Sequence, residues 1–99
     1  MVRHIVMWDF KDGFTDDENN LNAQKCKYEL ETAASVIDGI IAFEVNVCPL
    51  KTSNRDIVLN SLFESEGTLA AYQVHPAHIC ASSYVGSVMK NRSCIDYYE

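Results

Sequence analysis

The sequence lacks an apolar run long enough to cross a bilayer, and nothing at its start resembles a secretory signal. Residues 1–6 are without the long apolar core and the small-residue cleavage site that such a signal needs. We therefore expect a soluble, cytoplasmic protein that does not act on a membrane. With 99 residues and 47% hydrophobic content, the chain suits one globular domain, which we assign to residues 1–99.

Basic residues are few and scattered. The 8 Lys and Arg residues stand against 14 Asp and Glu residues, and the net charge is −6. Phosphate backbones are bound by clustered positive charge, so nucleic acid is excluded as the main partner. The acidic run Asp16–Glu18 falls at the start of a predicted helix, where the helix dipole favours negative charge without any metal.

Common sequence motifs of catalysis are also missing. There is no Gly-rich phosphate loop, no Ser-centred nucleophile elbow and no kinase motif. The four cysteines are far apart, which excludes a C-x-x-C zinc or redox motif: Cys26, Cys48, Cys80 and Cys94. We interpret them as reduced small hydrophobic residues and expect neither a metal nor a cofactor.

Apolar alternation predicts strands over residues 4–10, 40–47, 56–63 and 93–98. In the second of these, Ile41, Phe43, Val45 and Val47 are expected to share one face. Thr15 and Glu18 form a capping box, which predicts a helix that ends near Asp38 and Gly39. Ser65 is expected to cap a short helix, and a further helix should run from Pro76 to about Met89, where Asn91 breaks it.

The predicted order is β-α-β-β-α-β, with the second helix in two pieces, and this order is typical of a ferredoxin-like α+β fold. Helices can cover only one face of such an antiparallel sheet, yet the first three predicted strands carry large apolar residues on both faces. A second copy of the chain would cover the remaining face by two-fold symmetry. We therefore expect a homodimer that pairs through the open sheet face into an α/β barrel; a ligand-covered face in a monomer is the alternative.

Residues 72–78 bring a tyrosine and two histidines together around one of only two prolines. Pro76 disfavours helix at His75 and suits the first turn of a new helix, so these side chains are expected at a helix–helix corner. Histidine titrates near neutral pH and tyrosine donates a hydrogen bond, so Tyr72 and His78 could support acid–base chemistry. A hydrogen-bonded corner that only fixes the turn is the alternative.

Four segments resemble the stress-responsive α/β-barrel domain (Dabb) family of dimeric α+β barrels. They are residues 2–11, with His4 and Trp8; residues 39–45; residues 63–65 followed by 69–78, with the Tyr-Gln-Val-His-Pro-Ala-His motif; and residues 95–97. The resemblance implies a homodimer with a cavity between sheet and helices in each subunit. The family's functions are varied, and one member is a polyketide cyclase that needs neither metal nor cofactor.

In that cyclase the tyrosine and the last histidine of the motif carry out the reaction, and the resemblance transfers these roles to Tyr72 and His78. It also places His4 at the pocket, whereas a further pocket histidine of the cyclase corresponds to Ile57 here. His4, His75 and Trp8 are candidate binding residues; His75 could instead orient the helix corner, and Trp8 could instead be wall packing. The departure at Ile57 indicates different substrate contacts.

Three functional hypotheses remain open at this point. The first is an enzyme acting on a small hydrophobic carbonyl compound, with His78 as general base and Tyr72 as hydrogen-bond donor to the developing oxyanion. The second is a stress-related module that binds a small hydrophobic molecule without catalysis. The third is a metal site that uses His75 and His78, or backbone carbonyls near Asp38, and it is the least supported because no third side-chain ligand is apparent.

Overall fold

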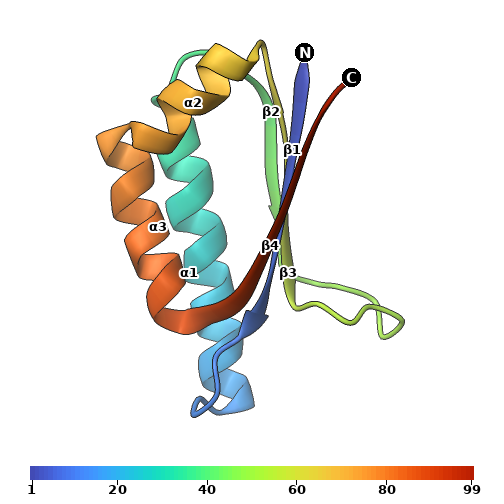
Figure 1. Ribbon diagram of the computed structural model, residues 1–99. Coiled ribbons are helices and arrows are strands. Elements are labelled where there is room, and N and C mark those ends of the chain that lie inside the picture. Colours follow the sequence, from blue (N-terminus) through green and yellow to red (C-terminus); the bar gives the residue numbers. More distant parts are fainter.

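The computed structural model describes residues 1–99 as one antiparallel sheet covered by helices on one side (Figure 1). The elements follow the predicted order: β1 Val2–Phe10, α1 Asp16–Ala34, β2 Ile40–Asn46, β3 Ile57–Phe63, α2 Glu66–Val74, α3 Pro76–Val88 and β4 Met89–Tyr98. The strand order in the sheet is β2-β3-β1-β4, which confirms the ferredoxin-like prediction. No helix is both long and apolar enough to cross a membrane.

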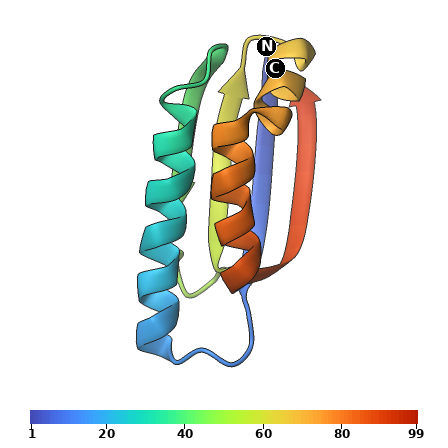
Figure 2. The same ribbon diagram turned by 90° about the vertical axis from the view of Figure 1, so that its left-hand side faces the viewer.

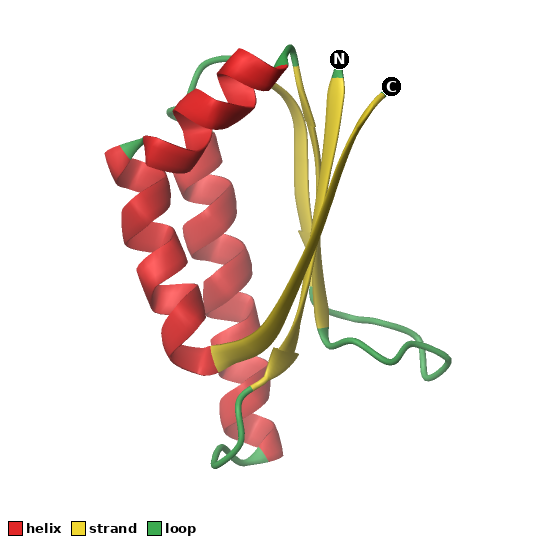
Figure 3. Ribbon diagram, viewed as in Figure 1, coloured by secondary structure: helices red, strands yellow, loops and turns green.

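The helices α1 and α3 lie side by side along the sheet, and α2 crosses at one end (Figures 2 and 3). Burial alternates along the strand β1 beneath them, as the sequence predicted. In β1, the side chains Val2, His4, Val6 and Trp8 are buried, whereas those between them are more exposed. Because successive strand residues point to opposite faces, His4 and Trp8 lie on the helix-covered side of the sheet.

Helix α1 begins at the predicted capping box. The Glu18 backbone N–H donates to the Thr15 hydroxyl over 3.1 Å, and the Glu18 carboxylate accepts from the Thr15 N–H over 2.9 Å. The predicted end near Asp38 is wrong, because the helix stops at Ala34 and turns lead to Gly39. Gly39 has φ +86°, and a Cβ there would lie 2.5 Å from Cγ2 of Thr68, so the chain needs glycine where it enters β2.

Strand β2 departs from its predicted alternation at its first residues. A register shift against β3 falls between Ile40 and Ala42, and Ile41 is 47% exposed instead of sharing the buried face. Beyond the shift, Val45 is fully buried under α1. Its N–H donates to the Glu31 carboxylate over 2.9 Å, and its carbonyl accepts from Lys27 Nζ over 2.7 Å.

The last strand begins earlier than predicted. β4 starts at Met89, directly after α3, instead of at Ser93, and Asn91 lies inside the strand. Asn91 has φ +55°, which asparagine tolerates better than most residues, and it lies opposite a register shift between Met7 and Asp9. The Arg55 guanidinium donates to the carbonyls of Asn91 and Met7 and thereby holds this irregularity together.

No helix covers the second face of the sheet (Figure 1). Its side chains include the apolar residues Ile5, Met7, Val58, Leu62, Ile95 and Tyr97. Ile95 is 56% exposed and Tyr97 is 44% exposed. Arg3, Asn60 and Ser93 lie among them on this face. Exposed apolar side chains gathered on one face in this way are characteristic of an interaction surface.

Candidate functional site

A cavity of about 400 Å³ lies between the helix-covered face of the sheet and the corner where α2 meets α3. The apolar side chains in its wall include Trp8, Leu59 and Val85. The polar side chains in its lining come from four elements: His4, Tyr72, Gln73, His78, Ser82, Lys90, Asn91 and Arg92. A pocket that combines apolar walls with convergent polar groups is the usual form of a small-molecule site.

Local backbone chemistry builds the corner. Ser65 caps α2 by accepting the Thr68 N–H over 3.1 Å, and α2 ends where His75 becomes extended, with φ −66° and ψ 135°. Pro76 then begins α3 at a position where a missing N–H does no harm. The predicted break at Pro76 is confirmed, and it lets Tyr72 and His78 approach each other from two separate helices.

Tyr72 is the largest fully buried side chain, with 1% exposure. Its ring packs against Phe63, Phe43 and His4, with centroid distances of 5.0, 5.8 and 6.3 Å. The hydroxyl is buried and has no hydrogen-bond partner in the protein. Burial raises the pKa of Tyr72 far above its ordinary value, so the hydroxyl stays neutral. Its O–H is therefore a donor that no protein group uses.

His78 lies in the first turn of α3, and its ring centroid is 4.1 Å from that of Tyr72. Its Nδ1 is also buried without a partner. Burial lowers the pKa of His78, and the positive charges that His4 and Arg92 can carry lower it further. The imidazole is therefore neutral at neutral pH and able to accept a proton.

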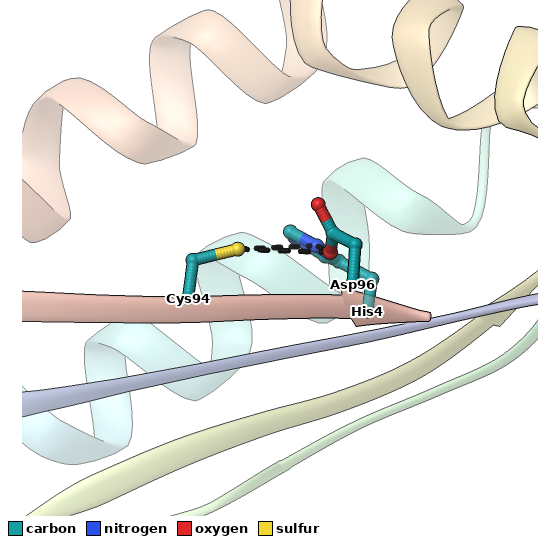
Figure 4. Close-up of side chains that lie close together, drawn as sticks. All are labelled: His4, Cys94 and Asp96. Atoms are coloured by element: carbon teal, nitrogen blue, oxygen red, sulfur yellow. Dashed lines mark hydrogen bonds and ion pairs between the residues drawn. The ribbon is translucent and has the colours of Figure 1, made fainter. Parts of the chain in front are cut away.

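His4 is 2% exposed, and its backbone is fixed by the buried hydroxyl of Ser61, which donates to the His4 carbonyl over 2.8 Å. Its Nδ1 pairs with the Asp96 carboxylate (Figure 4). Cys94 Sγ lies 3.7 Å from the same nitrogen. His4, Cys94 and Asp96 are the one group whose side-chain atoms could together hold a metal ion.

His75 is the one predicted binding residue outside the cavity lining. Its Nδ1 accepts the Ala77 N–H over 3.1 Å and caps α3, so it positions the corner and leaves ligand contact to its neighbours. His4, Trp8, Tyr72 and His78 all line the cavity. Of the expected site residues, these four are the ones that the fold brings together.

Three polar groups at this site were not predicted from the sequence: Arg92, Cys94 and Asp96. Arg92 lies in the cavity lining, and its positive charge acts on both Tyr72 and His78. All three come from β4, and His4, the partner of Cys94 and Asp96, is 90 and 92 residues away from them in sequence. Their spacing in the sequence places Cys94 and Asp96 on one face of a strand, but it does not show that this face lies beside His4.

A larger hollow of about 770 Å³ lies on the opposite face of the sheet, beside the loop between β2 and β3. Its lining includes Met7, Val58 and Leu50, which belong to the uncovered apolar face or its rim. It contains no histidine and no tyrosine. We attribute it to the exposed sheet face, whereas the unpartnered Tyr72 hydroxyl and His78 Nδ1 belong to residues that line the smaller cavity.

Comparison with curated proteins by sequence finds no match. A solved dimeric protein of unknown function from Bacteroides fragilis, with a ferredoxin-like fold, is 26% identical with a TM-score of 0.90, over 99% of this chain and 95% of that chain. A dimeric ferredoxin-like protein from Thermobifida fusca is 20% identical with a TM-score of 0.83, over 99% and 90%. A hydroxynitrile lyase from Passiflora edulis shares the fold at 11% identity, with a TM-score of 0.78 over 97% and 90%.

The family model described as the stress responsive A/B barrel domain (Dabb) matches residues 2–99. This range contains every strand and helix of the fold. The strand order, the helix corner and the cavity beneath it agree with the resemblance found in the sequence. The chain therefore belongs to the stress responsive A/B barrel domain family.

Proposed function

We propose that the protein binds a small, mostly apolar molecule with a carbonyl group in the cavity beneath the α2–α3 corner. The observation that carries this proposal is the pair of buried, unpartnered polar atoms, the Tyr72 hydroxyl and His78 Nδ1, on adjacent rings. Buried polar atoms are nearly always hydrogen-bonded, so an unpaired pair beside an open cavity suits a polar ligand. The volume of about 400 Å³ sets the ligand at small-molecule size.

The two groups differ in what they offer. Tyr72 is held neutral by burial and can donate its O–H to a carbonyl oxygen, whereas His78 can accept a proton from the neighbouring carbon. Arg92 adds positive charge on the same side, which favours a partly negative oxygen. The apolar part of the wall, with Trp8, Leu59 and Val85, suits a hydrocarbon tail.

Trp8 gives a direct readout of binding, since it is the only tryptophan and it lines the cavity. Alkyl methyl ketones of increasing chain length should change its fluorescence with saturation. Tyr72→Phe keeps the ring but removes the donor, so ketone affinity should fall about tenfold, in line with about 1.5 kcal/mol for one hydrogen bond. Tyr28→Phe, at a 67% exposed tyrosine, is the matched control.

A cofactor-free cyclase or lyase is the second candidate, and the lowered pKa of His78 favours it. In this reaction His78 takes a proton from the carbon beside the carbonyl, and the electron pair of that C–H bond forms an enolate whose oxygen accepts from Tyr72. The enolate then attacks a second carbonyl of a polyketide-like substrate. The alkoxide that forms takes the proton back from His78, so no external acid, metal or oxidant is needed.

Proton abstraction can be measured without knowing the natural substrate. In deuterium oxide, wild-type protein should accelerate deuterium exchange at the α-carbon of a bound alkyl methyl ketone, and His78→Asn should abolish that acceleration while ketone still quenches Trp8. Binding without exchange in the wild type supports the binding module and rejects the enzyme.

We also propose that the protein is a homodimer that pairs through the uncovered sheet face. The proposal is supported by the exposed apolar side chains Ile95 and Tyr97 on that face, and by the relative from Bacteroides fragilis, which is described as dimeric. Burying this face against a second copy would remove the apolar surface from water.

A further inference from the structure

We propose that His4, Cys94 and Asp96 form a binding site for one divalent transition-metal ion, with Zn²⁺ the best match. The donor atoms are the His4 Nδ1, the Cys94 Sγ and a carboxylate oxygen of Asp96, and all lie within 4.8 Å of one another. Imidazole, thiolate and carboxylate together are a donor set that suits zinc. Figure 4 shows the three side chains directed toward one point above the sheet.

The strand pairing explains why these three residues meet. His4 on β1 lies directly opposite Asp96 on the edge strand β4, and Val6 lies opposite Cys94. Residues two apart on a strand point to the same face. Asp96 therefore lies directly across from His4, and Cys94 lies diagonally across from it. The whole set is on the helix-covered side of the sheet, where His4 is buried and Cys94 and Asp96 are exposed.

The distances between the donor atoms fit tetrahedral coordination of one ion. Cys94 Sγ is 3.7 Å from His4 Nδ1 and 3.6 Å from Asp96 Oδ1. Ligand atoms around a tetrahedral zinc lie roughly 3.3–3.6 Å apart, given bonds of about 2.0 Å to nitrogen and oxygen and about 2.3 Å to sulfur. Only the direct contact between His4 and Asp96 must open, and Asp96 is exposed and free to rotate its carboxylate.

A nucleophilic Cys–His–Asp arrangement is excluded by the same geometry. In such a triad the cysteine and the carboxylate contact opposite ring nitrogens of the histidine, because one orients the base and the other is activated by it. Here both contact Nδ1.

Charge and access agree with a cation at this point. A thiolate and a carboxylate together balance the two positive charges of the ion. With three protein ligands the fourth position of a tetrahedron stays open, as in catalytic zinc sites. His4 lines the main cavity, and Asp96 lines a neighbouring hollow of about 210 Å³, so water or a small ligand can reach that position.

The test uses metal alone, so its outcome is independent of the carbonyl proposal. Metal-free protein is titrated with Zn²⁺ by calorimetry and with Co²⁺ by absorbance, where a thiolate ligand produces a sulfur-to-cobalt charge-transfer band. The wild type should bind one ion per chain and show the band. Cys94→Ser should lose the band, and both Cys94→Ser and Asp96→Asn should weaken Zn²⁺ binding by at least about tenfold.

Cys80→Ser is the matched control, since Cys80 is also an exposed free thiol but lies on α3 away from the cluster. It should leave both titrations unchanged. Cys94 and Asp96 are exposed, so their variants should fold, and circular dichroism verifies this. The proposal is overturned if the wild type binds no ion, or if Cys94→Ser and Cys80→Ser behave alike.

Discussion

The rings of Tyr72 and His78 lie 4.1 Å apart, centroid to centroid, although they belong to different helices on either side of Pro76. Neither the Tyr72 hydroxyl nor His78 Nδ1 has a hydrogen-bond partner in the protein. The protein therefore keeps a donor and an acceptor unpaired at the wall of a cavity. Leaving buried polar groups unsatisfied lowers the free energy of unfolding.

Tyr72→Phe should stabilise the ligand-free protein while weakening its binding of a ketone. The substitution keeps the ring packing against Phe63 and removes a buried hydroxyl that has no partner. The gain should be about 1 kcal/mol in the free energy of unfolding, at the low end of the penalty for an unsatisfied group. Urea unfolding of wild type and variant measures it. A clear loss of stability would mean that the hydroxyl is paired within the protein.

The stability of the fold should depend on pH through His78. Because the folded-state pKa of His78 lies below its ordinary value of 6.5, the unfolded chain binds more protons than the folded chain as pH falls past 6.5. Stability should therefore be full above that pH and decline below it. His78→Asn should flatten the decline between about pH 6.5 and pH 5, a window above most carboxylate titrations.

Thermal unfolding of the two proteins at several pH values gives that comparison. Equal slopes for wild type and His78→Asn over the window would show that His78 protonates as readily in the fold as outside it. His75 does not serve as a matched control, since its ring caps α3 and its removal would alter the corner itself.

Gly39→Ala should destabilise the fold by roughly 1–3 kcal/mol, the range for a residue held in a disfavoured backbone region. Gly39 has φ +86°, and the added Cβ would meet Cγ2 of Thr68 at 2.5 Å. Gly86→Ala is the matched control within α3, where a Cβ meets nothing within 4 Å. It should stabilise the helix by about 0.5–1 kcal/mol. Urea unfolding measures both variants, and a change in the free energy of unfolding that has the same sign in both would contradict this account.

Ile95→Asp should convert the proposed dimer to a monomer. Ile95 lies directly opposite Ile5 on the uncovered face, and a charge there would have to be buried on pairing. Leu21→Asp, at a 71% exposed position on α1, is the control and should leave the dimer intact. Light scattering with size exclusion measures both masses. A monomeric wild type would remove the dimer proposal.

Local signals accounted for most of the fold. The Thr15–Glu18 capping box, the apolar alternation of β1 and the break at Pro76 each act within a few residues, so a reader of the sequence can recognise them. The errors fell where distant contacts decide. Asn91 was taken as a helix stop, but Arg55, which is 36 residues away, holds it within a strand through backbone carbonyls.

The residues of the candidate site show the same contrast between local signals and distant contacts. Tyr72 and His78 were identifiable because the motif that contains them is short and continuous. Asp96 and Cys94 were not, since their role depends on the register between β1 and β4, which no local pattern specifies. His75 was a candidate binding residue that could also orient the helix corner, and the extended backbone before Pro76 turns it to cap α3.

The most direct test of the central claim is a crystal structure of the protein with a bound alkyl methyl ketone. The account predicts the carbonyl oxygen at hydrogen-bond distance from the Tyr72 hydroxyl, about 2.7 Å, with the α-carbon facing His78 Nδ1 and the alkyl chain along Trp8. A ketone bound only in the hollow on the uncovered sheet face, or a cavity filled solely by water that satisfies both groups, would contradict it.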